Sequence, residues 1–148
     1  MKRCGAGFAR RGEGRASTGA LLCRYLNMRN VKKSGETFDP TVSFIVPLFN
    51  KEEEVVSCIE KLFSYASGYG GFVEIFLIDN GSQDQTYEIA YAAIEVNKRR
   101  FPRLRVKLIR LTTRLELSEI VELCSRSALG QKMAIVRCEK GRMKAEVL

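Results

Sequence analysis

From residue 41 onward, short apolar runs alternate with segments whose apolar residues recur at helical spacing. The run Val42–Leu48 is nearly continuous and rich in β-branched residues, which is typical of a strand buried on both faces. The apolar side chains that follow share one helix face and are Val55, Val56, Ile59, Leu62, Phe63 and Ala66. This alternation predicts right-handed βαβ crossovers and a parallel sheet flanked by helices.

Further segments continue the pattern. Strands are predicted at 72–78, 104–111 and 133–136, and helices at about 85–98 and 117–128. Each predicted helix has a polar side chain near its start and a Glu or Gln at the spacing of a capping box. The predicted pairs are Asn50 with Glu53, Ser82 with Gln85, and Thr113 with Glu116.

Composition excludes several classes of protein. The chain carries a formal charge of +8, and its 45% hydrophobic content is enough for the core of one domain. It has no histidine, which excludes a Ser-His-Asp or Cys-His catalytic unit and a histidine-ligated metal within this chain. Neither GxGxxG nor GxxxxGK[ST] occurs, so the two commonest phosphate-binding loops are missing. The longest apolar runs are much shorter than a membrane-spanning helix.

Five cysteines lie at positions 4, 23, 58, 124 and 138. They form no CxxC pair and show no spacing typical of a zinc site or a small disulfide framework. Reduced thiols in a cytosolic protein are therefore expected.

Positive charge concentrates in two segments. Residues 1–40 hold nine basic and three acidic side chains and are predicted to form a flexible arm ahead of a domain at 41–148. The arm could anchor the chain to nucleic acid or to an anionic membrane, act as an organellar targeting segment, or be a solvated tail that does little. Residues 98–114 hold eight basic side chains and no acidic one, which favours a solvated face. Only Phe101 is interleaved with these cations, which argues against a nucleic-acid platform.

Polar residues follow the first two predicted strands, at Phe49–Glu52 and Asp79–Ser82. Ligands of parallel α/β sheets bind at the carboxyl ends of the strands, so both segments lie at the expected functional edge. The same residue types also serve ordinary turns, and composition alone leaves both interpretations open.

The two segments Val42–Glu52 and Val73–Thr86 resemble the opening of family 2 glycosyltransferases, which have the GT-A fold. In that family a strand ends in Pro-x-Tyr-Asn-Glu, and a later strand ends in Asp-Asp/Asn-Gly-Ser-x-Asp-x-Thr. Dolichyl-phosphate mannose and glucose synthases share this opening. The resemblance implies an α/β fold in which a Rossmann-like half, truncated here, binds a nucleotide-diphosphate sugar.

The resemblance also implies a set of site residues. Phe49 takes the place of a tyrosine that lies against the base, and Asp79 and Asn80 lie by the base and ribose. Gly81 permits a close backbone approach, and Ser82 caps the next helix. The residues assigned to the nucleotide-sugar site are Pro47, Phe49, Asn50, Glu52, Asp79, Asn80, Gly81, Ser82 and Arg137.

The metal motif of the resemblance departs from the family pattern. Members continue with Gly-x-Tyr, three apolar residues and Asp-x-Asp, whose acidic pair holds Mg²⁺ or Mn²⁺ against the diphosphate. Here Gly130 takes the glycine position, and Arg137, Cys138 and Glu139 take the acidic motif. Glu139 is the one carboxylate left to hold a metal, while Arg137 suits phosphate directly. The alternative is that the metal site is lost.

Two functional hypotheses follow. In the first, the chain binds a UDP- or GDP-linked sugar and transfers it to a lipid phosphate or a glycan hydroxyl, through catalytic residues that the sequence leaves unassigned. In the second, it is a non-catalytic nucleotide- or partner-binding module with a basic arm. Exposed strand edges predict a homo-oligomer or a partner chain. The expected location is the cytoplasm, including the cytoplasmic face of a membrane.

Overall fold

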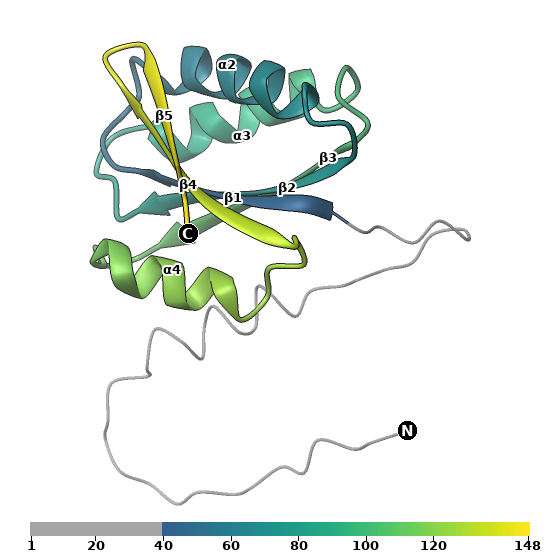
Figure 1. Cartoon of the computed structure of the whole chain (residues 1–148). Coiled ribbons are helices and arrows are strands. Elements are labelled where there is room, and N and C mark those ends of the chain that lie inside the picture. The colour runs from purple at the N-terminus through teal and green to yellow at the C-terminus, as the bar shows by residue number, and fades with distance from the viewer. Residues whose placement is uncertain (1–39) are drawn as a thin grey trace, which may run out of the picture. The chain divides into compact units, whose positions relative to one another are not determined.

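A computed structural model describes residues 40–148, which form one five-stranded sheet in the order β3-β2-β1-β4-β5 (Figure 1). The strands β1 to β4 are parallel, and β5 runs antiparallel to β4. Their bounds are β1 Pro40–Leu48, β2 Phe72–Asn80, β3 Leu104–Leu111, β4 Lys132–Glu139 and β5 Arg142–Val147. The predicted parallel α/β sheet is confirmed, with an antiparallel strand added at one edge.

Three helices cover the two faces of the sheet unequally. In Figure 1, α2 (Val55–Ser67) and α3 (Thr86–Asn97) lie on one face, and α4 (Leu117–Ser125) lies on the other. Side chains alternate along each strand, so Phe44 and Ile75 enter the core beneath α2 and α3, while Ile45 and Phe76 point toward the α4 side. All four are fully buried. The predicted strands and helices match the observed bounds to within three residues at each end.

The strand β5 is absent from the sequence-based prediction. The turn before it places Lys140 at φ 48° and Gly141 at φ 71°. Two-residue hairpin turns with positive φ at both positions are usually recognised in a sequence from Asn-Gly or Asp-Gly. Here the pair is Lys140-Gly141, which is not typical of such a turn. Most side chains of β5 are exposed, so the strand also lacks the apolar run of a buried strand.

All three predicted helix caps need correction. Val55 starts α2 after Glu54, which makes no side-chain cap, and Asn50 instead lies in the left-handed region at φ 48°. Gln85 precedes α3, again without a side-chain cap. Thr113 caps nothing, because the capping box of α4 is formed by Glu116 with Glu119. The side chains of Asn50 and Ser82, predicted as helix caps, instead form hydrogen bonds between the two loops.

Glu74 in the middle of β2 is a fully buried carboxylate on the α4 face. Its Oε2 accepts hydrogen bonds from the Ser43 hydroxyl at 2.8 Å and the Leu129 amide at 2.9 Å, and its Oε1 pairs with Lys107 Nζ at 2.8 Å. Ser43 Oγ accepts in turn from the Gly130 amide at 2.9 Å. A buried charge is tolerated only when it is paired and hydrogen-bonded, so this network fixes the α4–β4 connection against β1, β2 and β3.

Gly130 is required by this network because the chain passes over β1 at very short range. A Cβ at position 130 would lie 2.4 Å from the Ser43 amide nitrogen. We expect Gly130→Ala to lower the free energy of unfolding by about 2 kcal/mol, as overpacking does, measured by urea denaturation. Gly70→Ala is the matched control, since a Cβ there would meet nothing within 4 Å. Equal stability of the two variants would contradict this account.

Cys58 on α2 and Cys138 on β4 form a disulfide with their Cα atoms 5.9 Å apart. The expectation of reduced thiols is therefore wrong for this pair. The two cysteines are 80 residues apart in the sequence, so their spacing does not predict a disulfide. The fold brings them together by placing α2 next to the end of β4. Cys124 is free and buried, and desolvation raises the pKa of its thiol to about 12. Cys4 and Cys23 lie outside the described residues.

Removing the disulfide should destabilise the domain, because the bond restricts a long loop in the unfolded chain. We expect the double variant Cys58→Ser, Cys138→Ser to lose about 2–4 kcal/mol of unfolding free energy in urea. Dithiothreitol should then destabilise the wild-type chain and leave the variant unchanged. An equal effect of the reductant on both chains would show that this bond does not form.

The predicted arm at 1–40 lies outside the described residues except for Pro40, which begins β1. Within 40–148, none of the helices combines the length and the apolar character needed to cross a bilayer. The outer strands of the described sheet are β3 and β5. Outer strands leave backbone groups open for pairing, and a homo-oligomer stays a prediction.

Candidate functional site

The loops that follow β1 and β2 are joined by a set of hydrogen bonds. The backbone amides of Asn50 and Lys51 donate to Ser82 Oγ at 3.0 Å and to Thr86 Oγ1 at 2.7 Å. In the reverse direction, the Gln83 amide donates to Asn50 Oδ1 at 2.9 Å. The Glu52 amide donates to Asp84 Oδ2, and the Gln85 amide donates to Glu52 Oε2. Polar residues of both motif segments thus hold the two loops together.

Asp84 is the acidic centre of this contact between loops. It also accepts hydrogen bonds from the amide and the hydroxyl of Thr86. Desolvation alone would raise the pKa of this carboxyl, but the hydrogen bonds from Thr86 and from the Glu52 amide outweigh it and lower the pKa below its ordinary value. The charged form of Asp84 is therefore the one that the loops stabilise.

A groove of about 680 Å³ lies at the carboxyl ends of β1, β2 and β4 and beside the start of α4. Its walls come from the two motif loops, from the β3–α4 loop and from the end of β4. The lining residues are Pro47, Leu48, Phe49, Lys51, Asn80, Arg114, Leu115, Glu116, Leu117, Ile120, Arg137, Cys138 and Glu139.

The groove brings together part of the predicted site. Pro47, Phe49, Asn80, Arg137 and Glu139 line it. Strand alternation explains the choice, because every second residue at the ends of β1 and β2 points to the α4 side. The predicted residues that do not line it are Asn50, Glu52, Asp79, Gly81 and Ser82.

Asp79 lies on the opposite side of the sheet edge from the groove. It is fully buried, and its Oδ1 accepts the Ser82 amide at 3.2 Å. Its Oδ2 lies 3.6 Å from Arg110 Nε and makes no hydrogen bond. The predicted contact of Asp79 with a base stays a prediction, and the observed role is in the turn before α3.

Asn80 and Gly81 hold the β3–α4 loop at the groove. The Asn80 amide donates to the Leu115 carbonyl at 2.9 Å and accepts from the Leu115 nitrogen at 2.8 Å. A Cβ on Gly81, which has φ +75°, would lie 3.1 Å from the Arg114 nitrogen. Gly81 therefore permits a close approach of the chain's own backbone at Arg114, and its predicted role toward a ligand stays a prediction. Ser82 does not cap α3, since its hydroxyl accepts the Asn50 amide.

The aromatic ring expected to stack on a base is already in contact with a cation. The Arg114 guanidinium carbon lies 4.0 Å from the centroid of the half-buried Phe49 ring. This distance is well within the range of a cation–π interaction. Sequence reasoning named Arg114 only as the last cation of the 98–114 stretch and did not place it at the site.

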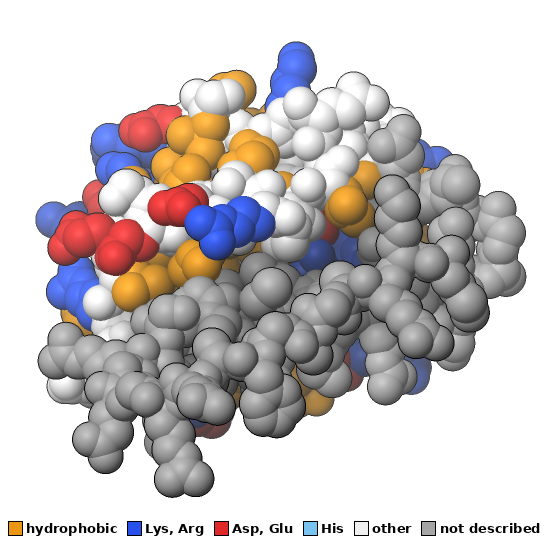
Figure 2. All heavy atoms as spheres, turned by 90° about the horizontal axis from the view of Figure 1, so that it is seen from below, with side chains coloured by type: hydrophobic (Ala, Val, Ile, Leu, Met, Phe, Trp, Pro, Cys, Tyr) orange, Lys and Arg blue, Asp and Glu red, His pale blue; other side chains and the backbone are white. Residues whose placement is uncertain are grey.

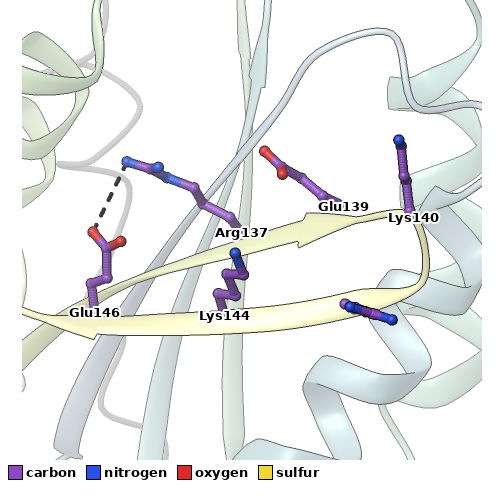
Figure 3. Close-up of a pocket in the computed structure, with 6 residues that line it drawn as sticks. Arg137, Glu139, Lys140, Lys144 and Glu146 are labelled. Atoms are coloured by element: carbon purple, nitrogen blue, oxygen red, sulfur yellow. Dashed lines mark ion pairs between the residues drawn. The ribbon is translucent and has the colours of Figure 1, made fainter.

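Beyond the groove, Arg137 and Glu139 also line a second hollow of about 480 Å³ on the β4–β5 hairpin (Figure 3). Arg137 points from β4 toward Glu146 of β5, with Nη2 4.0 Å from Oε2. Lys140, Arg142 and Lys144 also line this hollow, so basic side chains outnumber acidic ones here.

The residues at the expected metal motif do not fit a divalent cation. Arg137 is positively charged, and the sulfur of Cys138 is held in the disulfide, which leaves Glu139 as the single carboxylate of the motif. Hard divalent cations need several oxygen ligands. Within residues 40–148, no group of three or more potential metal-binding side chains is present.

Part of the basic stretch at 98–114 is paired with carboxylates. Lys98 pairs with Glu95, Lys107 with Glu74, and Arg110 with Glu88 and Asp79. Figure 2, which shows the molecule from below, also has acidic and basic side chains side by side on the part formed by described residues. Three of the eight cations of the stretch are therefore engaged in ion pairs with carboxylates.

Comparison with known proteins identifies the family. The sequence model described as Glycosyl transferase family 2 matches residues 43–137, which is more than half of the chain. The chain belongs to glycosyl transferase family 2. The match contains both motif loops and ends at Arg137, so it includes the groove-lining residues from Pro47 to Arg137 but not Cys138 and Glu139.

Individual known proteins share part of this sequence or of its fold. Glycosyltransferase AglE of Haloferax volcanii is 39% identical over 51 residues, which are 34% of this chain and 16% of that protein. The mannosyltransferase PcManGT from Pyrobaculum calidifontis, solved with GDP-Man and Mn²⁺, has a TM-score of 0.54 at 22% identity over 80% of this chain and 33% of its own. Glucosyl-3-phosphoglycerate synthase from Mycobacterium tuberculosis gives a TM-score of 0.48 at 19% identity over 71% and 38%. The likeness to the mannosyltransferase shows a GT-A type fold, and the chain spans about a third of that protein.

Acid should weaken the contact between the two motif loops. Because the folded-state pKa of Asp84 is lowered, its contribution to stability is complete above the unfolded value of about 3.9 and is lost as the pH falls through the folded value. We expect wild type to be more stable than Asp84→Asn at pH 7, with a difference that shrinks below pH 4 or so. Thermal unfolding of both chains between pH 7 and pH 3 measures this. A difference that stays constant over this range would contradict the assignment.

Proposed function

We propose that the groove binds the nucleoside diphosphate of a UDP- or GDP-linked sugar, and that the domain is the donor-binding half of a glycosyltransferase. The observation that carries the proposal is the convergence of Phe49, Asn80 and Arg137 on one groove. Three separate segments of the family match supply these residues. The solved mannosyltransferase with a similar fold holds GDP-Man, which supports the ligand class.

The chemistry of the three side chains suits the parts of such a ligand. The Phe49 ring offers an apolar face to a base, and stacking on an aromatic ring contributes about 1–3 kcal/mol per base. Asn80 lines the same groove, with one lone pair of its oxygen used by Leu115 and a second available to a base N–H. Arg137 carries a planar guanidinium that matches the geometry of phosphate oxygens.

Sugar transfer needs more than donor binding. An acceptor hydroxyl or phosphate must be placed beside the sugar, and a hydroxyl must lose its proton to a general base. We propose a lipid phosphate or a glycan as the acceptor. A lipid acceptor would place the reaction at a membrane surface.

Calorimetric titration of the chain with UDP, GDP and GDP-mannose tests donor binding. We expect Phe49→Ala to weaken binding about tenfold, which corresponds to about 1.4 kcal/mol of lost stacking. Tyr91→Ala is the matched control, because Tyr91 is an exposed aromatic residue on α3 outside the groove. Since the metal motif does not fit a cation, binding should be the same in EDTA and in Mn²⁺. The proposal fails if no nucleotide binds or if both variants behave like wild type.

A further inference from the structure

Arg114 covers the ring that a nucleobase would need. Its guanidinium lies over Phe49 at 4.0 Å, and a base stacked on that face would occupy the same space. Among the described residues, Lys107 and Arg110 pair with carboxylates, whereas no carboxylate forms an ion pair with Arg114. The guanidinium of Arg114 therefore has an aromatic neighbour but no anionic partner within residues 40–148.

The backbone at Arg114 is fixed, although its side chain is exposed. The adjoining Leu115 is held by two hydrogen bonds, since its carbonyl accepts from the Asn80 amide nitrogen and its own amide donates to the Asn80 side-chain oxygen. Gly81 packs closely against the Arg114 nitrogen. The exposed side chain can reorient while this backbone stays in place, and Arg114 already lines the groove. This arrangement suits a side chain that exchanges one partner for another without moving the loop.

We propose that Arg114 switches partners when a nucleoside diphosphate binds, leaving the Phe49 ring to the base and pairing with the diphosphate. This inference rests on the proposed function of the groove. The other two cations of the groove already have acidic neighbours, since Lys51 lies 3.6 Å from Glu54 and Arg137 lies 4.0 Å from Glu146. Arg114 is thus the cation whose charge is most available for a phosphate.

The exchange is energetically favourable for a ligand that carries phosphate. An exposed cation–π contact is weak, whereas charge-assisted hydrogen bonds between a guanidinium and phosphate are stronger and are often bidentate. A ligand without phosphate must displace the guanidinium from the ring but forms no guanidinium–phosphate hydrogen bonds that offset this cost. Arg114 therefore selects nucleotides against nucleosides.

Removing the Arg114 side chain should change the affinities for nucleosides and for nucleoside diphosphates in opposite directions. In Arg114→Ala, we expect uridine and guanosine to bind about threefold more tightly, because the ring is no longer covered. We expect UDP and GDP to bind about tenfold more weakly, because a charge-assisted contact is lost. Arg114→Lys should recover part of the diphosphate affinity, since it keeps the charge but loses the planar fork.

Calorimetric titrations of the full chain with these four ligands in EDTA test the inference. Arg100→Ala is the matched control, because its guanidinium also lies over a phenylalanine ring, Phe101, at 5.7 Å, but at the opposite end of β3 and outside the groove. An unchanged melting temperature of Arg114→Ala confirms that the domain folds.

The outcomes separate this inference from the proposal on which it rests. Opposite changes for nucleosides and nucleoside diphosphates support the partner switch. If wild type binds GDP and Arg114→Ala weakens both ligand classes together, or changes neither, the inference is overturned while nucleotide binding stands. If wild type binds no nucleotide, the proposed function and this inference fail together.

Discussion

The buried carboxylate of Glu74 sets the constraint on which the groove depends. A charge in the middle of the sheet must find partners, and they come from β1, β3 and the α4–β4 connection. Satisfying it brings Gly130 directly over Ser43 and sets β4 beside β1, with Ile135 opposite Ile45. Because β4 is parallel to β1, its last residues then emerge next to the loop that follows β1. Arg137 and Glu139 reach the groove for this reason.

In the two motif segments, the side of the sheet that a side chain faces decides whether it lines the groove or hydrogen-bonds between the loops. At the ends of β1 and β2, Pro47, Phe49 and Asn80 point to the α4 side and line the groove. The other polar residues of the motifs hydrogen-bond between the loops and fix the groove's position. Those residues are Asn50, Glu52, Ser82, Asp84 and Thr86. The family pattern therefore combines a potential binding surface with the framework that holds it rigid.

Positive charge takes the place of the acidic pair in this domain. Lys51, Arg114 and Arg137 line the groove, against Glu116 and Glu139. The Glu116 side chain is engaged in the capping box of α4, which reduces the negative charge that it presents to a ligand. A cationic groove with a fixed aromatic ring suits a nucleoside diphosphate held by guanidinium groups. The disulfide between Cys58 and Cys138 ties the end of β4 to α2 and so anchors one wall of this groove.

The sequence by itself determined the βαβ order, the location of the strand ends and the family, because these depend on local periodicity and on short motifs. It also placed Pro47, Phe49, Asn80 and Arg137 at the ends of strands that share one edge. Only the tertiary structure decided which polar side chains serve the loops, that Arg114 lies over Phe49, that Cys58 meets Cys138, and that β5 completes the sheet. The physical reason is distance along the chain. Each of these contacts joins residues far apart in sequence or, for β5, follows an unusual turn, and no local pattern encodes which distant group will arrive.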